Sequence, residues 1–196
     1  MQQKKEKIVL APTDLSNFLS CSHSSRRDLD AARGSVARPV RYGPALDALK
    51  ERGRKHEKLY LEYLRGNGLL VVDASDYESS ETSQVNSNEK TLSAMQSGAD
   101  IIYQPALADN TWCGRADFLR KVDRPSDLGD WSYEVIDTKL AHETKAGTIL
   151  QLCVYSYLLE KLQGVRPEFM HVVTPGADYK PDRTNRVPRF VLSEQS

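Results

Sequence analysis

One eight-residue stretch, Tyr133–Leu140, constrains this chain more than any other. It is rich in β-branched and aromatic residues and follows a turn-like run over 124–130, so it predicts a buried strand. Because side chains alternate along a strand, Asp137 and Lys139 project side by side from one face. Because charged residues are usually solvated, the pair is either an ion pair on a half-exposed strand or part of a functional site. Other residues of the chain are needed to distinguish these two possibilities.

Length and composition favour one ordinary globular domain over residues 1–196. At this length a single core can form, and the contents of 39% hydrophobic and 28% charged residues exclude a disordered chain. We expect an N-terminal helix and a basic connection within 1–42, followed by a core over 43–196. No apolar run approaches the roughly eighteen residues that span a bilayer, and the start has no apolar signal core. These features predict a cytoplasmic protein without a membrane partner.

The cysteines and the charge distribution limit the kinds of site that the chain can form. Cys21, Cys113 and Cys153 lie far apart without a C-x-x-C pair, so they predict neither a zinc site nor a disulfide framework. The last two lie in apolar segments and are expected to be buried. Residues 1–66 carry 14 Lys and Arg against 8 Asp and Glu, whereas residues 67–110 carry 1 against 7. A basic N-terminal third is compatible with phosphate contacts, although charged runs are more often solvated surface.

Periodicity predicts helices that alternate with strands. We expect a helix that opens at Pro12 with Thr13 as its N-cap, and further helices over 44–65, 89–98 and 144–163. Strands are predicted over 8–10, 69–72, 100–108, 111–122, 133–140, 168–174 and 189–192, with a hairpin at 108–110. The polar segments 21–42, 73–88 and 176–186 show no periodicity and are expected to be irregular. This order predicts a mixed sheet flanked by helices, an α/β fold of three layers.

The helix over 44–65 is expected to bury one histidine. Its apolar stripe, at spacings of three and four, comprises Leu46, Leu49, Gly53, His56, Tyr60 and Tyr63 with Leu64. His56 lies one turn from Gly53, where a close backbone approach is possible. A lone histidine on an apolar face is usually a core residue, but Glu57 beside it adds an oxygen donor.

The pattern turns six polar side chains inward: His56, Asp117, Asp137, Lys139, Gln151 and Tyr155. Asp117 lies on a strand with apolar neighbours, where Gly114 indicates that something packs close to the backbone. Two aspartates with a histidine or a glutamate can hold Mg²⁺ or Mn²⁺. A lysine beside them can orient or deprotonate a water molecule. This combination suits metal-assisted hydrolysis of a phosphodiester.

Four short motifs follow one another in the chain: Gly53-Arg54-Lys55-His56-Glu57, Gly114-Arg115-Ala116-Asp117, Glu134-Val135-Ile136-Asp137-Thr138-Lys139 and Gln151-Leu152-Cys153-Val154-Tyr155. In these motifs and their order the chain resembles the PD-(D/E)XK nuclease superfamily. It is most similar to the RecB-like branch, which includes CRISPR-associated exonucleases and helicase-linked nuclease domains. Residues 15–21 look like the opening helix of that branch. The resemblance implies a restriction-endonuclease-like fold.

The resemblance also implies roles for individual residues. The metal ligands would be His56, Asp117, Asp137 and the carbonyl of Thr138, and Lys139 would be catalytic together with the two aspartates. Gln151 and Tyr155 would face DNA or support the site. Further nucleic-acid contacts are expected from the basic side chains Arg52, Arg54, Lys55 and Arg115.

One feature of that branch is not expected in this chain. Several members hold an iron–sulfur cluster with one cysteine near the N-terminal helix and three near the C-terminus. Cys21 fits the first position, but no cysteine follows Cys153. Relatives also carry this domain within longer polypeptides, so the 196 residues are either a fragment or a stand-alone version.

The expected function is therefore a nuclease that depends on Mg²⁺ or Mn²⁺ and hydrolyses single- or double-stranded DNA in repair, recombination or defence. A helicase or another repair protein is a candidate partner. One alternative is a nucleic-acid-binding module that keeps the fold without catalysis, and another is a protein in which the cluster is only a structural ion pair. The intact D-x-K pair argues against the binding module, because a dead site has no reason to keep charges inward. The sequence does not distinguish a DNA substrate from an RNA substrate, or an exonuclease from an endonuclease.

Overall fold

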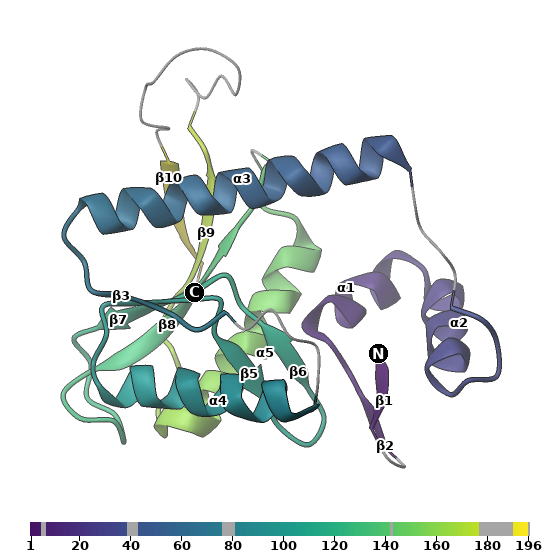
Figure 1. The fold of residues 1–196 in the computed structure, drawn as a ribbon, viewed down its shortest axis with the longest axis horizontal. Helices are drawn as coiled ribbons and strands as arrows, with labels where there is room; N and C mark the ends of the chain where they lie inside the picture. Colours follow the sequence, from purple (N-terminus) through teal and green to yellow (C-terminus); the bar gives the residue numbers. More distant parts are fainter. Residues whose placement is uncertain (5–6, 39–42, 76–80, 142, 177–189, 196) are drawn as a thin grey trace.

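The computed structural model describes residues 1–4, 7–38, 43–75, 81–141, 143–176 and 190–195 (Figure 1). Its elements, in chain order, are β1 (Gln2–Lys4), β2 (Lys7–Val9), α1 (Pro12–Ser20), α2 (Ser22–Ala32), α3 (Pro44–Gly66), β3 (Val71–Asp73), α4 (Glu81–Gln96), β4 (Ile101–Tyr103), β5 (Ala106–Ala108), β6 (Cys113–Arg115), β7 (Phe118–Val122), β8 (Ser132–Thr138), α5 (Ala146–Gln163), β9 (Met170–Pro175) and β10 (Phe190–Gln195).

A mixed sheet of six strands, in the order β10-β9-β8-β7-β4-β3, forms the centre. Neighbouring strands are antiparallel except for the β3–β4 and β8–β9 pairs. The predicted central strand is β8, which is interior and ends at Thr138 rather than at Leu140. Its register with β7 pairs Ile136 with Phe118, one residue after Asp117. The mixed sheet and its central strand are therefore confirmed.

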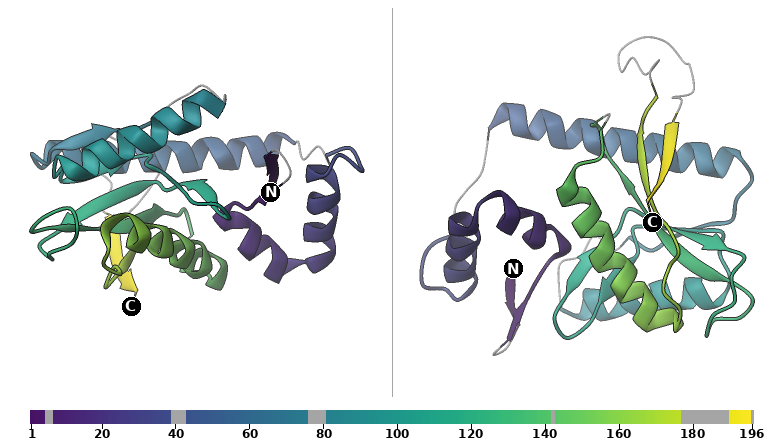
Figure 2. Two further views of the ribbon diagram at one scale, coloured as in Figure 1. Left: turned by 90° about the horizontal axis from the view of Figure 1, so that it is seen from below. Right: turned by 180° about the vertical axis from the view of Figure 1, so that it is seen from behind.

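Helices cover both faces of this sheet, which gives three layers (Figures 1 and 2). The C-terminal half of α3 packs its Tyr60, Leu61 and Leu64 onto one face, against a cluster that includes Phe118 and Ile136. The other face carries Tyr133, Val135 and neighbouring strand residues, and packs against the apolar sides of α4 and α5. The predicted alternation along β8 thus divides its side chains between two cores, and the three-layer α/β class is confirmed.

A glutamate and a histidine are buried on the α3 side of the sheet, away from the D-x-K motif. Glu134 of β8 lies 2.7 Å from the ring nitrogen Nε2 of His171 in β9, and it accepts a hydrogen bond of 3.0 Å from the backbone N–H of Phe169. Burial opposes ionisation, but these hydrogen bonds hold the pKa of Glu134 below its usual value. The alternation of strand side chains therefore separates this pair from Asp137.

Two segments predicted to be irregular are helical. Part of 21–42 forms α2, whose first turn is held by Cys21, which accepts from the N–H of Ser24 through its sulfur and from that of Ser25 through its carbonyl. Part of 73–88 belongs to α4, which begins at Glu81. The buried face of α4 includes Ser87 and Thr91, whose hydroxyls bond to Arg115 and to the N–H of Ala106. The second part of α4 falls within the helix predicted over 89–98, whereas its first part was not predicted, because a hydrogen-bonded serine replaces an apolar residue on its buried face.

The two long predicted strands are each broken in two. The first divides into β4 and β5 at Gln104, which has a positive φ of 52° and precedes Pro105. The second divides into β6 and β7 at residues 116–117. β5 and β6 form the predicted hairpin as a small separate sheet. Because of this break, Asp117 lies between the two strands, and its carboxylate can turn toward the end of β8.

The stripe predicted for α3 is correct for His56, Tyr60 and Leu64, whereas Tyr63 is exposed. In the N-terminal half Leu46 and Leu49 are exposed as well, and a Cβ added to Gly53 would meet no atom of the described residues within 4 Å, so no close approach is seen there. The reason is visible in Figure 1, where the N-terminal half of α3 extends beyond the sheet. Apolar periodicity alone does not report where the supporting layer ends.

Smaller corrections concern boundaries and exposure. Ala11, not Thr13, caps α1, since Asp14 accepts a hydrogen bond from the N–H of Ala11. Cys153 is exposed and Cys113 is half-buried, so their predicted burial is wrong. The loop predicted over 176–186 lies outside the described residues except at position 176. Within the described ranges, none of the helices is both long enough and apolar enough to cross a membrane.

Candidate metal and nucleic-acid site

The end of β8 and the turn before β7 bring two of the predicted site residues together. Asp117 Oδ2 accepts hydrogen bonds of 2.7 Å from both the N–H and the Oγ1 hydroxyl of Thr138. Thr138 directly follows Asp137, so Asp117 and Asp137 lie at the same end of the sheet although twenty positions separate them. Their charges interact, because Asp117 raises the pKa of Asp137.

Asp137 is buried, with 3% of its surface exposed, and is paired with the lysine of its own motif. Lys139 Nζ lies 2.5 Å from Asp137 Oδ2, and a third of the lysine side chain is exposed. Burial and the nearby Asp117 raise the pKa of Asp137 to about 7, and Lys139 only partly offsets them. The aspartate thus lies at the boundary between its protonated and ionised forms at neutral pH, as expected of a carboxylate that lacks sufficient positive charge.

Helix α3 brings His56 and Glu57 to the same region from the opposite face of the sheet. His56 is buried and bonds to the backbone of Val173, and burial lowers its pKa while Asp117 acts in the opposite direction. Glu57 has its pKa raised by burial and by the charge of Asp117. Asp117 therefore interacts electrostatically with His56, Glu57 and Asp137, and it is the common member of the site.

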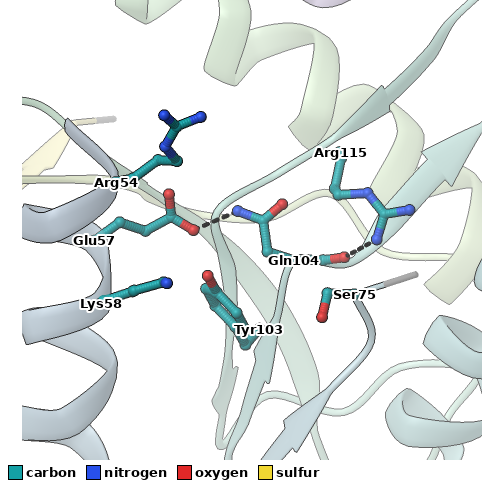
Figure 3. A pocket seen from close by; sticks show the side chains of 7 residues that line it. All are labelled: Arg54, Glu57, Lys58, Ser75, Tyr103, Gln104 and Arg115. Carbon is teal, nitrogen blue, oxygen red and sulfur yellow. Dashed lines mark hydrogen bonds between the residues drawn. The ribbon is translucent and has the colours of Figure 1, made fainter. Parts of the chain in front are cut away.

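A pocket of about 340 Å³ opens beside Glu57 (Figure 3). Its residues are Arg54, Glu57, Lys58, Ser75, Tyr103, Gln104 and Arg115. Three of them come from α3, and Figure 3 shows them opposite Gln104 and Arg115. The pocket combines three cations with one carboxylate, which suits an anionic ligand that approaches the Asp117 region.

Arg115 and Gln104 form a frame for this pocket. The Arg115 guanidinium donates to the carbonyls of Ala74 (3.1 Å) and Gln104 (2.9 Å), and to Ser87 Oγ (3.2 Å). The Gln104 amide in turn donates to Glu57, and its backbone N–H donates to the carbonyl of Asp117. A positive φ at a residue other than glycine is uncommon, and here it aims the Gln104 side chain at Glu57. Arg115 therefore supports the site through protein contacts, and its predicted contact with nucleic acid stays a prediction.

Tyr155 and Gln151 of α5 support the segment before Asp117. The Tyr155 hydroxyl donates to the carbonyl of Arg115 at 2.7 Å, and Gln151 bonds to that hydroxyl. Gly114 lies against the same tyrosine, since a Cβ added there would come within 3.0 Å of the hydroxyl and 2.7 Å of Pro12 Cδ. The close packing predicted at Gly114 is thus confirmed. The contacts of Gln151 and Tyr155 match a supporting role, and contact with DNA is untested.

The three basic residues predicted on α3 lie on its exposed N-terminal half. Arg52, Arg54 and Lys55 are all exposed, and Arg54 pairs with Glu51 at 2.9 Å. Arg54 also lines the pocket beside Glu57. These cations are thus accessible to a ligand, and their role in binding nucleic acid stays a prediction.

The candidate donor groups have the right chemistry for a hard divalent cation, but their positions in the structure do not form a ligand set. Asp117, Asp137 and Glu57 supply carboxylate oxygens, which Mg²⁺ and Mn²⁺ prefer. Burial and the charge of Asp117 raise the pKa values of Asp137 and Glu57. Across the part of the chain that the structure describes, however, no three His, Cys, Asp or Glu side chains are arranged to hold a metal. His56 approaches from the α3 face while Asp137 lies on the α5 face and contacts Lys139. A shared ion for His56, Asp117 and Asp137, with the Thr138 carbonyl, therefore stays a prediction.

Sequence comparison adds no family assignment: no protein-family model and no curated protein matches this chain. The interpretation therefore depends on the residues and their geometry.

Four members of the pocket were not among the predicted site residues: Lys58, Ser75, Tyr103 and Gln104. Lys58 directly follows Glu57, and an extension of the histidine motif by one residue includes it. The Gln104-Pro105 dipeptide is the available signal for Tyr103 and Gln104, since a proline inside an apolar strand marks a break. The hydrogen bond from Gln104 to Glu57 spans 47 positions and has no periodic signal.

Proposed function

We propose that this chain is a divalent-metal-dependent nuclease that hydrolyses phosphodiester bonds of DNA. The observation that carries the proposal is the clustering of Asp117, Asp137 and Lys139 at one end of the sheet, with the pKa of Asp137 raised to about 7. A buried, partly uncompensated carboxylate beside a lysine is a costly arrangement that catalysis requires and that core packing does not. The resemblance of the four motifs to RecB-like nucleases agrees with this reading.

The ligands for a divalent cation would be Asp117 and Asp137, with His56 or Glu57 as the next donors. When bound, Mg²⁺ or Mn²⁺ would offset charge on the phosphoryl group and lower the pKa of a water molecule. For Asp137 to act as a ligand, its Oδ2 must exchange the ammonium of Lys139 for the cation.

Release of this ion pair gives Lys139 its role. Its Nζ is then free to donate to a phosphate oxygen or to position the attacking water. Hydrolysis joins the water oxygen to phosphorus and breaks the bond to the leaving ester oxygen, which gains a proton. The hydrogen bonds from Thr138 keep the Asp117 carboxylate fixed meanwhile, so little reorganisation is needed.

The second candidate is a nucleic-acid-binding module without catalysis. The observation that favours it is the closed Asp137–Lys139 ion pair together with the lack of a three-ligand group among the described residues. A permanent ion pair would leave the cationic pocket beside Glu57 for binding alone.

One experiment separates the two candidates. The purified protein is incubated with end-labelled single- and double-stranded DNA and RNA in Mg²⁺, Mn²⁺ or EDTA. The nuclease proposal predicts cleavage of DNA with either metal and none in EDTA. Binding without cleavage under every condition would instead support the binding module.

A further inference from the structure

A second pocket, of about 620 Å³, lies between α1 and α2, outside the candidate nuclease site. Figures 1 and 2 show these helices beside the three layers rather than within them. The lining residues are Met1, Phe18, Ser22, His23, Ser25, Arg26 and Leu29. We call this the α1–α2 pocket, and none of its residues has a part in the nuclease site described above.

One polar group in the α1–α2 pocket is buried without a hydrogen bond to any described residue. Ser25 is 5% exposed, and its Oγ has no hydrogen-bond partner within the described ranges of the chain. A hydroxyl that is buried and unsatisfied costs free energy, whereas a ligand that bonds to it recovers that cost. This serine therefore indicates a ligand with a hydrogen-bonding group.

The charges around Ser25 indicate an anion. Ser22, His23, Ser25 and Arg26 belong to the first turn and a half of α2, an eleven-residue helix. The N–H groups at a helix N-terminus and its dipole favour phosphate, and the Arg26 guanidinium adds a full positive charge. Among the described residues that line the pocket, none carries a carboxylate side chain.

The pocket also has apolar lining residues. Phe18 of α1 is 55% exposed although it is a large aromatic side chain, and Leu29 of α2 belongs to the same lining. An exposed aromatic ring beside a phosphate-binding helix end is the combination that holds an unpaired base and its phosphate.

The α1–α2 pocket is connected to the nuclease site through α1. This helix begins at Pro12, which lies against Gly114 of the second motif, and reaches the pocket at Phe18. Six residues of helix rise by about 9 Å. At about 3.4 Å per nucleotide along a strand, the length of α1 between the second motif and the pocket corresponds to roughly three nucleotides.

We propose that the α1–α2 pocket binds one unpaired nucleotide of the substrate strand, with its phosphate at the N-terminus of α2 beside Arg26 and its base against Phe18. The inference rests on the proposed nuclease function and specifies its substrate: a strand with single-stranded character a few nucleotides from the cut. Ser25 Oγ supplies a hydrogen bond to the sugar or the base.

The test measures binding without cleavage. A dye-labelled octathymidylate is titrated in EDTA into the wild-type chain and into the variants Phe18→Ala, Ser25→Ala and Arg26→Gln. Leu19→Ala and Arg27→Gln are matched controls, because both residues are exposed neighbours that do not line the pocket. Melting curves show whether each variant is folded.

Each pocket variant is expected to weaken binding, with Phe18→Ala about tenfold weaker, the scale of one lost base stack, while both controls stay within twofold. Oligonucleotides with a single abasic position then locate the stacked base. One abasic position should weaken wild-type binding about as much as Phe18→Ala does, and should weaken that variant no further.

Equal binding of every abasic oligonucleotide by the wild type would overturn the proposal, as would controls that lose as much affinity as the pocket variants. Thymidine monophosphate that binds as tightly as the strand would overturn it too, in favour of a free-nucleotide site. Failure of the nuclease proposal gives a different result: no cleavage in Mg²⁺ or Mn²⁺, with the abasic effect retained.

Discussion

At the scale of single residues, Asp117 is the residue that interacts with most of the other members of the candidate site. It fixes the end of β8 through two hydrogen bonds to Thr138, and its charge shifts the pKa of Glu57 and Asp137. Asp137 is paired with Lys139, and this counter-ion is itself the proposed catalytic group. Two predictions follow from this double use of one lysine.

The first prediction concerns Lys139→Ala. If Lys139 handles water or transition-state charge, the variant should bind DNA and Mg²⁺ within a few-fold of wild type, while cleavage falls about a hundredfold or more. Single-turnover cleavage and calorimetry measure the two properties, and Lys145→Ala, an exposed lysine nearby, is the control. A variant that cuts at the wild-type rate would refute the role. Loss of stability without a specific loss of cleavage would identify a structural ion pair.

The second prediction concerns pH. Asp137 binds a proton more tightly in the folded chain, with a pKa of about 7, than in the unfolded chain, where aspartate has a pKa near 3.9. Between about pH 4 and 7 the folded state therefore holds more protons, so the free energy of unfolding in EDTA should fall as pH rises, by up to about 1.4 kcal/mol per unit. Denaturation at several pH values measures this decline. Asp137→Asn should remove most of it, and an unchanged slope in that variant would contradict the assignment.

Metal binding should show the opposite pH dependence. Because a proton competes with the cation at Asp137, Mg²⁺ affinity and cleavage should both increase from pH 6 to pH 8.

The candidate residues could be predicted from sequence because short-range rules place them. The alternation of side chains along one strand puts Asp137 beside Lys139. A glycine inside a predicted strand indicates close packing against the backbone, and this is found at Gly114. The contact of Gln104 with Glu57 could not be predicted, because it depends on a positive φ and a chain break.

At the scale of elements, α1 and α5 both pack against the second motif. Pro12 of α1 and Tyr155 of α5 both contact the backbone at 114–115. Strand β8 and helices α3 and α5 could be predicted because their buried positions are mostly apolar. The C-terminal part of α4 lies within the helix predicted over 89–98, where Ala94 and Met95 are buried. Helix α2 and the first part of α4 could not be predicted, because their buried positions include Ser25 and Ser87.

A third prediction compares two glycines. In Gly114→Ala the new Cβ would lie 2.7 Å from Pro12 Cδ and 3.0 Å from the Tyr155 hydroxyl, so overpacking should destabilise the fold by about 1–3 kcal/mol. In Gly53→Ala the Cβ meets nothing within 4 Å, and the variant should gain about 0.5–1 kcal/mol, since alanine favours a helix. Chemical denaturation measures both values. A neutral Gly114→Ala would show that α1 does not pack on this strand.

At the scale of the whole molecule, part of the positive charge of the N-terminal third lies on the half of α3 that extends past the sheet. That half carries Arg52, Arg54 and Lys55 and adjoins the pocket beside Glu57. Sequence composition revealed the surplus of positive charge, but not that a projecting helix displays it.

The fourth prediction tests this basic surface. Replacing Arg52, Arg54 and Lys55 together by alanine should weaken DNA binding and reduce the slope of log affinity against log salt by up to about two to three, because fewer counterions are released. Arg65→Ala, at the far end of the same helix, is the control. An unchanged slope in the triple variant would place the contact surface elsewhere.

The most direct test of the central claim is the Mg²⁺-dependent cleavage rate of wild type and Asp117→Asn under single-turnover conditions at pH 8. The amide oxygen can still accept from Thr138, so the variant should fold and should bind DNA within a few-fold. The proposal predicts that wild type cuts DNA with Mg²⁺ but not in EDTA, and that Asp117→Asn cuts at least about a hundredfold more slowly. Equal rates for the two proteins, or wild-type protein that binds DNA but never cuts it with Mg²⁺ or Mn²⁺, would contradict the account.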